Sequence, residues 1–96
     1  MTTPEGKIED YLVKRVRETG GFTRKLKWIG HNGAPDRMVW WNTPEQQRVY
    51  FIELKAPGEA ATSQQKSEHR KMRESGLSVF VFDSKKHIDD LVKPHT

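Results

Sequence analysis

Two short segments, residues 49–54 and 77–82, are apolar on both faces and place the strongest limit on the fold. Segments of this kind are typical of strands inside a sheet that is covered on both sides. Between them, Thr62 and Gln65 have the spacing of a helical capping box, and Gly76 ends the helix that they begin. A strand, a helix and a strand in succession form a right-handed crossover with parallel strands. The chain is therefore expected to have an α/β fold.

The residues before this unit predict another helix and two more strands. Thr3 can cap a helix that Pro4 begins and that Gly20 and Gly21 end. The apolar stripe of this helix consists of Ile8, Leu12, Val13 and Val16. The predicted strands cover residues 22–29 and 37–41, joined by a turn rich in Gly, Asn and Pro over residues 30–35.

A short helix closes the chain, capped by Asp83 or Ser84 and stopped by Pro94. Its apolar residues are Ile88, Leu91 and Val92. The predicted order is therefore α-β-β-β-α-β-α, a mixed four-stranded sheet flanked by helices, whose first three strands form an antiparallel meander. A chain of 96 residues suits one domain, here residues 1–96.

Composition excludes several classes of protein. The chain has no cysteine, which excludes a disulfide framework and a thiolate zinc site. The histidines lack the spacing of paired zinc ligands and are read as solvated or locally bonded: His31, His69, His87 and His95. No stretch is long and apolar enough for a membrane span or a signal sequence, so a soluble intracellular protein is expected. The net charge of +4 favours polyanionic partners.

Charged side chains gather where a turn enters one predicted strand and where the next one ends. Asp36 stands in the turn Gly-Ala-Pro-Asp-Arg, while Glu53 and Lys55 end the segment Phe-Ile-Glu-Leu-Lys. Glu53 and Lys55 are two residues apart on a strand, so they project from the same face. If the two strands pair, Asp36 lies beside Glu53. An acid inside so apolar a strand is costly without a partner.

Two neighbouring carboxylates repel each other unless a cation lies between them. Such hard oxygen ligands suit Mg²⁺ or Mn²⁺, and the backbone carbonyl of Leu54 is a further candidate ligand. A site of this kind polarises a phosphate and activates water, while Lys55 can orient or deprotonate that water. Each residue alone also fits a plainer role, Asp36 as a turn former and Glu53 with Lys55 as a solvated strand edge.

Other residues are candidates for the same site. Glu9 borders the apolar stripe of the first helix, where it could reach the metal directly or through water, or reach solvent instead. Gln65 could complete the capping box or present its amide to the site. Basic side chains that could contact DNA phosphates, or be solvated surface charges, are Arg24, Lys25, Lys27, Arg37, Arg70, Lys71 and Arg73.

Pro35-Asp36 followed by Glu53-Leu54-Lys55 resembles the PD-(D/E)XK nuclease pattern, and within that superfamily the chain is most similar to the VRR-NUC domain. The resemblance covers nearly the whole chain. It includes the helix with Glu9, the turn before Arg37, Pro57-Gly58 after the strand, and Gln65 before Gly76. One departure is Ala61-Thr62-Ser63, where a Leu-Ser pair is expected.

The resemblance implies a restriction-endonuclease-like core and DNA cleavage that depends on Mg²⁺ or Mn²⁺ and leaves a 5′-phosphate and a 3′-hydroxyl. By family analogy, the acidic metal ligands are Glu9, Asp36 and Glu53. Lys55 is then the catalytic lysine, and Gln65 supports the site. The family includes the nuclease module of an interstrand-crosslink repair enzyme and stand-alone forms from phages and bacteria.

This chain resembles the stand-alone forms, since it carries no added DNA-binding domain. The implied substrate is branched DNA, Holliday junctions in particular, in the cytoplasm of a bacterial host. A four-way junction takes two matched cuts and one chain has one site, so a homodimer is expected. Trp40, Trp41 and Phe80 fit either the core or a dimer interface. Two other functions stay open: a non-catalytic module that binds branched DNA, and an accessory subunit of a larger complex.

Overall fold

The computed structural model of the chain describes residues 2–93, which form three helices and four strands. In chain order the elements are α1 (Pro4–Glu18), β1 (Phe22–Lys25), β2 (Arg37–Asn42), β3 (Gln47–Leu54), α2 (Ser63–Glu74), β4 (Val79–Phe82) and α3 (Lys85–Val92). The predicted α-β-β-β-α-β-α order is confirmed. The predicted stop at Pro94 lies outside the described residues, and so does His95. Within residues 2–93, no helix combines the length and the apolar character that crossing a membrane requires.

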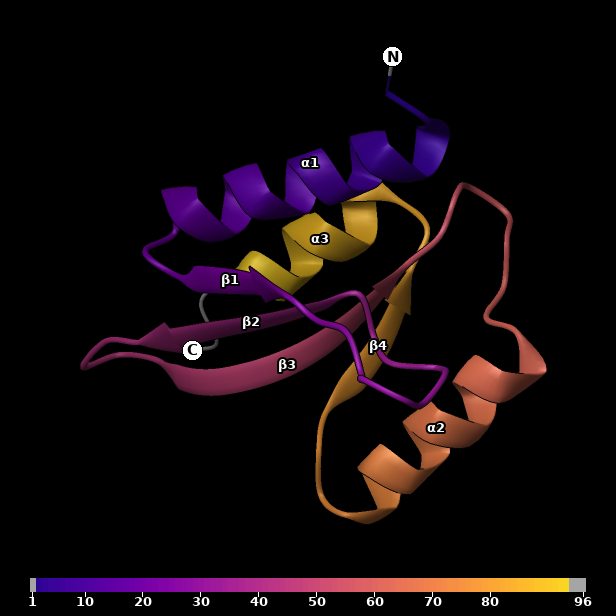
Figure 1. The fold of residues 1–96 in the computed structure, drawn as a ribbon. Coiled ribbons are helices and arrows are strands. Elements are labelled where there is room, and N and C mark those ends of the chain that lie inside the picture. The colour runs from indigo at the N-terminus through magenta and orange to yellow at the C-terminus, as the bar shows by residue number, and fades with distance from the viewer. Residues whose placement is uncertain (1, 94–96) are drawn as a thin grey trace.

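The strands form one mixed sheet in the order β1-β2-β3-β4. The first three are antiparallel neighbours and β4 is parallel to β3, as the predicted meander and crossover require. Figure 1 shows α1 and α3 together on one face of the sheet, with α2 on the other side, beside β4. The two faces are therefore covered unequally, because α2 lies at only one end of the second face.

The hydrophobic core lies between the sheet and the pair formed by α1 and α3. Ile8, Leu12 and Val16 of α1 are buried there, as the predicted apolar stripe requires. They form one cluster with Val39, Trp41, Ile52, Leu54, Phe82, Ile88, Leu91 and Val92. Each fully buried aliphatic or aromatic side chain contributes about 1.5–3 kcal/mol of burial free energy. This layer holds β2 and β3 in place, the two strands at whose ends Asp36, Glu53 and Lys55 lie.

All three helices begin at the residues that the sequence indicates. The Thr3 hydroxyl accepts from the Gly6 N–H (3.0 Å) at the start of α1. Both bonds of the predicted capping box between Thr62 and Gln65 are present at the start of α2. Of the two candidates for the third cap, Ser84 is the N-cap of α3. These caps satisfy backbone N–H groups that have no partner inside the helix.

The first predicted strand, residues 22–29, is wrong in length, because β1 covers only its first half. The Leu26 N–H still donates to the Asp36 carbonyl (2.8 Å), and the chain then leaves the sheet. Trp28 turns towards α2, where its indole N–H donates to the Glu68 carboxylate (2.7 Å). Contacts with α2 thus override the alternating pattern of the sequence.

The strands β3 and β4 also differ from the prediction. β4 begins two residues later than Leu77, because the Leu77 N–H donates to the Met72 carbonyl at the end of α2 (3.0 Å). β3 was expected to be buried along its length, yet Val49 is 46% exposed and only Ile52, Glu53 and Leu54 are fully buried. The second half of β3 is the part that α2 and β4 help to cover.

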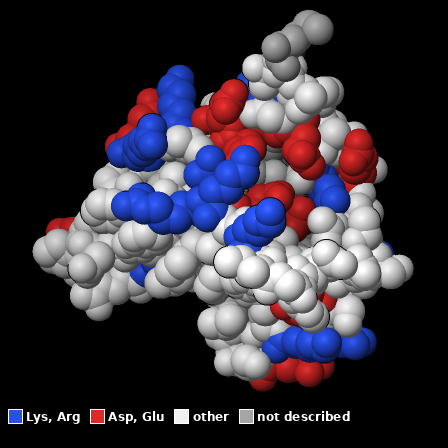
Figure 2. All heavy atoms as spheres, viewed as in Figure 1, with Lys and Arg blue, Asp and Glu red and all other residues white. Residues whose placement is uncertain are grey.

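Charged side chains are unevenly distributed over the surface. In Figure 2, Lys and Arg side chains form a band over the part of the molecule where Figure 1 draws β1. A group of Asp and Glu side chains lies directly beside this band. Positive and negative regions therefore meet on one side of the molecule.

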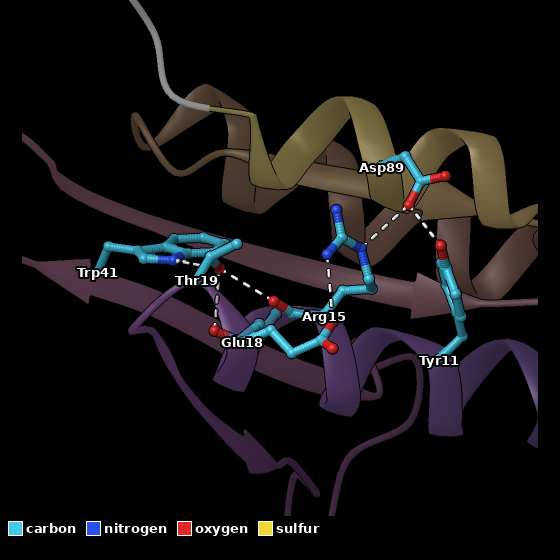
Figure 3. Close-up of polar contacts among 7 residues, drawn as sticks. Tyr11, Arg15, Glu18, Thr19, Trp41 and Asp89 are labelled. Carbon is cyan, nitrogen blue, oxygen red and sulfur yellow. Dashed lines mark hydrogen bonds and ion pairs between the residues drawn. The ribbon is translucent and has the colours of Figure 1, made fainter.

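A polar cluster joins α1 to α3 (Figure 3). Asp89 of α3 accepts from the Tyr11 hydroxyl (2.6 Å) and from Arg15 Nε (3.2 Å), both on α1. At the end of α1, the Thr19 hydroxyl accepts from the Trp41 indole N–H (3.0 Å). The Tyr11 hydrogen bond, followed by that of Arg15, lowers the pKa of the Asp89 carboxyl. The ionised form of Asp89 therefore stabilises the contact between the two helices.

Replacing Asp89 by Asn should lower the melting temperature at pH 7, because the amide keeps an acceptor oxygen and loses the charge. A lowered folded-state pKa stabilises the protein above the unfolded-state value, and this contribution is lost as the pH falls through the folded-state value. The difference in melting temperature between wild type and Asp89→Asn should therefore shrink between pH 5 and pH 2. Calorimetric scans at several pH values measure this difference. A difference that does not change with pH would contradict the stabilising role of ionised Asp89.

Gly33 allows the loop between β1 and β2 to lie directly on α2. Its φ of +95° belongs to the left-handed region, and a Cβ built on it would lie 2.9 Å from the Gln64 carbonyl oxygen. Gly30 in the same loop also has a positive φ, +75°, but a Cβ there would meet nothing within 4 Å. Only Gly33 therefore combines a special backbone conformation with a close approach to another element.

Gly33→Ala should destabilise the protein more than Gly30→Ala, since both substitutions strain the backbone and only the first also collides with α2. We expect strain of about 1–3 kcal/mol for either variant, with a further loss for Gly33→Ala from the displaced loop. Urea unfolding of both variants measures the two free energies. Equal losses would show that the contact with α2 contributes nothing.

Candidate active site

The turn before β2 brings Asp36 to the second half of β3. β2 pairs with β3 so that Arg37 lies opposite Ile52. One residue earlier, the Asp36 carboxylate accepts from the Leu54 N–H (2.7 Å). The predicted proximity of Asp36 to the Glu53-Leu54-Lys55 segment is therefore present, and a backbone hydrogen bond holds it.

Glu53 is a buried carboxyl, with 2% of its surface exposed. Burial, followed by the contact and charge of Asp36, raises its pKa to about 8. Lys55 acts in the opposite direction and favours the ionised form. Glu53 is therefore an acid that is buried beside a second carboxyl group, and both of these features disfavour its ionised form.

The sequence allowed two roles for Gln65, completion of the capping box or an amide directed to the site, and in the structure its side chain makes both contacts. Its Oε1 accepts from the Thr62 N–H (2.9 Å), which completes the capping box of α2. Its Nε2 donates to Glu53 Oε2 (3.1 Å). One amide therefore links the start of α2 to the acidic pair.

Lys55 directly follows β3, on the same face as Glu53. Its backbone N–H donates to the Phe82 carbonyl (2.9 Å), which extends the pairing with β4 by one residue. The backbone of Lys55 is thus fixed at the end of β3, and the positive charge of its side chain acts on the buried carboxyl of Glu53.

A hard divalent cation fits these residues. Glu53 Oε1 is buried and has no hydrogen-bond partner in the described part of the chain. An oxygen of this kind is a free ligand position, and burial, followed by the neighbouring Asp36 carboxyl, raises the pKa of Glu53. No group of three or more acidic or histidine side chains with metal-binding geometry occurs within residues 2–93. Mg²⁺ is commonly held by only one or two carboxylates with retained waters, so the donor set suits it.

Glu9 is held by basic residues. Its carboxylate accepts from Arg37 Nε (2.9 Å) and lies 3.7 Å from Lys25 Nζ. Arg37 directly follows Asp36, so Glu9 is linked to the motif through that side chain. Glu5, one turn earlier on α1, also acts on the site, since its negative charge contributes to the raised pKa of Glu53 after the larger effects of burial and Asp36. Glu5 was not among the predicted site residues, because it lies outside the motif formed by Asp36, Glu53 and Lys55.

The basic residues predicted to meet DNA occupy two places. Arg24 and Lys25 lie in β1, Lys27 follows shortly after it, and all three side chains are exposed. The Arg24 guanidinium lies 5.4 Å from the centre of the Trp40 ring. Arg70 is exposed on α2, with Glu74 at 4.0 Å. Arg73 is used internally, because its guanidinium donates twice to the Val79 carbonyl (3.0 and 2.7 Å).

The reading of His69 as solvated or locally bonded is wrong, because this side chain is buried inside the protein. Its Nε2 lies 3.6 Å from Glu53 Oε1. Burial, followed by the charge of Arg73, lowers the pKa of His69 and favours the neutral imidazole. The spacing of His69, four residues after Gln65, is the signal that could have placed it at the site.

Two other histidines pair with acids at the surface. His31 Nε2 lies 3.2 Å from Glu68, which also accepts from Trp28. His87 Nδ1 lies 3.4 Å from Asp83 at the start of α3. Neither contact involves Asp36 or Glu53.

The chain is similar to a curated phage protein and to a solved structure. No family model matches the chain. A curated phage protein, "Putative nuclease p44" of Acyrthosiphon pisum secondary endosymbiont phage 1, is 40% identical over 80 residues, which is 83% of each chain. A solved structure described as a VRR_NUC domain is 32% identical and superposes with a TM-score of 0.84, covering 99% of this chain and all of its own. The fold, the order of its elements and the extent of both similarities lead to one conclusion: the chain belongs to the VRR-NUC family of nucleases.

Proposed function

We propose that this nuclease is an endonuclease that hydrolyses phosphodiester bonds of DNA with the help of Mg²⁺ or Mn²⁺, and that it acts on branched DNA as a homodimer. The observation that carries the proposal is the pair formed by Asp36 and Glu53. Glu53 is buried with Asp36 beside it, and Glu53 Oε1 has no hydrogen-bond partner in the described chain. A divalent cation would satisfy that oxygen and allow both groups to ionise.

The residues that would hold the cation are Asp36, Glu53 and the backbone carbonyl of Leu54, with Glu9 as a candidate through water. When bound, such a cation supplies polarisation of the scissile phosphate and activation of a water molecule. Asp36 is oriented for this role by the Leu54 N–H, and Glu53 is oriented by the Gln65 amide. Both carboxylates are thus fixed before substrate arrives, which lowers the cost of reaching the reactive geometry.

Lys55 is the candidate catalytic residue that acts on the attacking water and on the negative charge of the phosphate. Its backbone is held by Phe82, and the charge of its ammonium group acts on Glu53. From there the ammonium form can orient the attacking water and offset negative charge on the phosphate during the displacement, whereas the neutral amine form can accept a proton from that water. Gln65, which contacts Glu53, would also face the attacking water or the phosphate.

DNA would approach over the exposed basic residues of β1 and of the segment that follows it. These are Arg24, Lys25 and Lys27, with Arg37 and Arg70 as further candidates for phosphate contacts. Basic side chains next to the scissile phosphate hold the backbone of DNA without reading its sequence. This arrangement supports a nuclease that selects the shape of its substrate.

A row of exposed apolar side chains supports the homodimer. Phe22, Trp40 and Val49 are cross-strand neighbours on β1, β2 and β3, so they project from one face of the sheet. Phe22 is 48% exposed and stacks on Trp40, with ring centres 5.5 Å apart. The adjacent Trp41 is buried against α1, which places the row on the opposite face. A second copy covering this face would bury the row and bring two sites to one junction.

Replacement of Lys55 by Ala should lower the rate constant for cleavage about 10²- to 10⁴-fold without unfolding the protein, as expected for the loss of a proton-transfer group. The measurement is single-turnover cleavage of labelled four-way junction, flap and duplex DNA with Mg²⁺, Mn²⁺ or EDTA. Lys86→Ala removes an exposed lysine of α3 and is the matched control. A folded Lys55→Ala protein that cuts at the wild-type rate, or wild-type cutting in EDTA, would refute the proposed chemistry.

Phe22→Glu should convert a dimer to monomers, because it places a charge at one end of the apolar row, next to Trp40. We expect the dissociation constant to rise at least about 30-fold, the effect of losing one aromatic anchor worth 2 kcal/mol. Light scattering measures the mass, and junction cleavage should change from paired cuts to single nicks. Ile29→Glu is the control, since Ile29 is 96% exposed and lies outside the sheet. A wild-type protein that is monomeric at all concentrations would eliminate this part of the proposal.

A further inference from the structure

A buried histidine faces the acidic pair and has no role in the chemistry above. His69 and Gln65 are one turn apart, so their side chains project from the same face of α2. Gln65 Nε2 lies 3.1 Å from Glu53 Oε2, and His69 Nε2 lies 3.6 Å from Glu53 Oε1. Two residues of one helix therefore contact the two oxygens of one carboxyl group.

The facing atoms of His69 and Glu53 are both buried, and neither has a hydrogen-bond partner anywhere in residues 2–93. A buried polar atom without a partner carries a free-energy penalty, which an apolar side chain at position 69 would avoid. At 3.6 Å, a small shift of either side chain brings the two atoms within hydrogen-bonding distance. One hydrogen bond between them would remove both penalties, so the presence of His69 is best explained by Glu53.

We propose that His69 is a positioning residue, which donates a hydrogen bond from Nε2 to Glu53 Oε1 and thereby orients this carboxylate for the cation. The proposal rests on the proposed function and assigns it one more residue. A carboxylate oxygen has two lone pairs, so Oε1 can accept this bond and still act as a ligand. Gln65 holds the other oxygen, and together the two side chains fix the rotation of the carboxylate. Partners of this kind commonly set the geometry and basicity of metal ligands.

The first test examines the wild-type protein and needs no cleavage. The proposal requires the His69 tautomer that carries its proton on Nε2. Long-range ¹H–¹⁵N NMR spectra of the imidazole nitrogens distinguish this tautomer from the other, and His69→Gln assigns the signals. A proton on Nε2 that is protected from exchange supports the proposal. A proton on Nδ1, or a rapidly exchanging one, overturns it.

The second test compares two substitutions at position 69. His69→Gln can place an amide N–H near the position of Nε2, whereas His69→Phe keeps a ring without a donor. Alanine is unsuitable, because His69 lines a cavity of about 490 Å³ with Lys66, Arg73 and Val81, and truncation would enlarge it. Met72→Leu, a conservative change at a buried position of the same helix, controls for disturbed packing.

We expect His69→Phe to weaken Mn²⁺ binding and lower kcat about 10- to 100-fold, the range for loss of a partner to a metal ligand. The KM for DNA should stay within twofold, His69→Gln should recover most of the loss, and Met72→Leu should match wild type. Calorimetric titration with Mn²⁺ alone and steady-state cleavage measure these quantities. Wild-type Mn²⁺ affinity and kcat in His69→Phe, or equal losses in both variants, would overturn the proposal.

Failure of the proposed function gives a different result. A wild-type protein that binds no Mn²⁺ and cuts no DNA under any metal would refute the nuclease chemistry, and the NMR test would still report whether His69 holds Glu53. A wild-type protein that cuts DNA, together with an unaffected His69→Phe, would refute only the role of His69. If His69→Phe does not fold, the comparison of His69→Gln with wild type and the tautomer decide the question.

Discussion

The structure depends on one buried acid in the middle of a sheet. A carboxyl group at the position of Glu53 is costly to bury, and Asp36 from the turn before β2 adds to this cost. The surrounding residues act in the other direction, since Gln65 of α2 donates to Glu53, His69 lies 3.6 Å from it and the charge of Lys55 favours its ionised form. The loop that leads to Asp36 is itself held on α2 by Trp28 and by the close contact of Gly33. Much of the polar architecture on this face of the sheet is therefore organised around a single side chain.

The two faces of the sheet differ in what they contribute to the protein. On one face, α1 and α3 bury an apolar layer and are joined by the contacts of Asp89, so this half supplies most of the stability. On the other face, α2 covers only the end that carries the charged residues, and the apolar row beginning at Phe22 is left exposed. Because stability comes mainly from the first face, the second can carry strained glycines, unpaired polar atoms and exposed aromatic rings without unfolding the domain.

Much of the fold and part of the site could be predicted from local signals. Thr62 with Gln65, the apolar runs and the Asp36, Glu53 and Lys55 spacing depend on residues near one another in sequence, and the structure contains the elements that they indicate. The end of β1 could not be predicted, because Trp28 leaves the sheet to meet Glu68, forty residues away. The place of His69 was missed because Glu53 lies on another element, so the helical spacing of His69 from Gln65 points to the site only once Gln65 itself is placed there.

The two bonds of Gln65 have a consequence for which amino acids position 65 can accept. The residue must offer an acceptor to the backbone of Thr62 and a donor to Glu53 at the same time. Glutamate keeps the acceptor but would repel Glu53, lysine keeps the donor but cannot accept, and asparagine is one methylene too short to span both. Glutamine alone among the long side chains meets both demands. The first turn of α2 and the placement of Glu53 are thereby coupled, and a chain in which this turn has frayed has also lost the hydrogen bond from Gln65 to the acid.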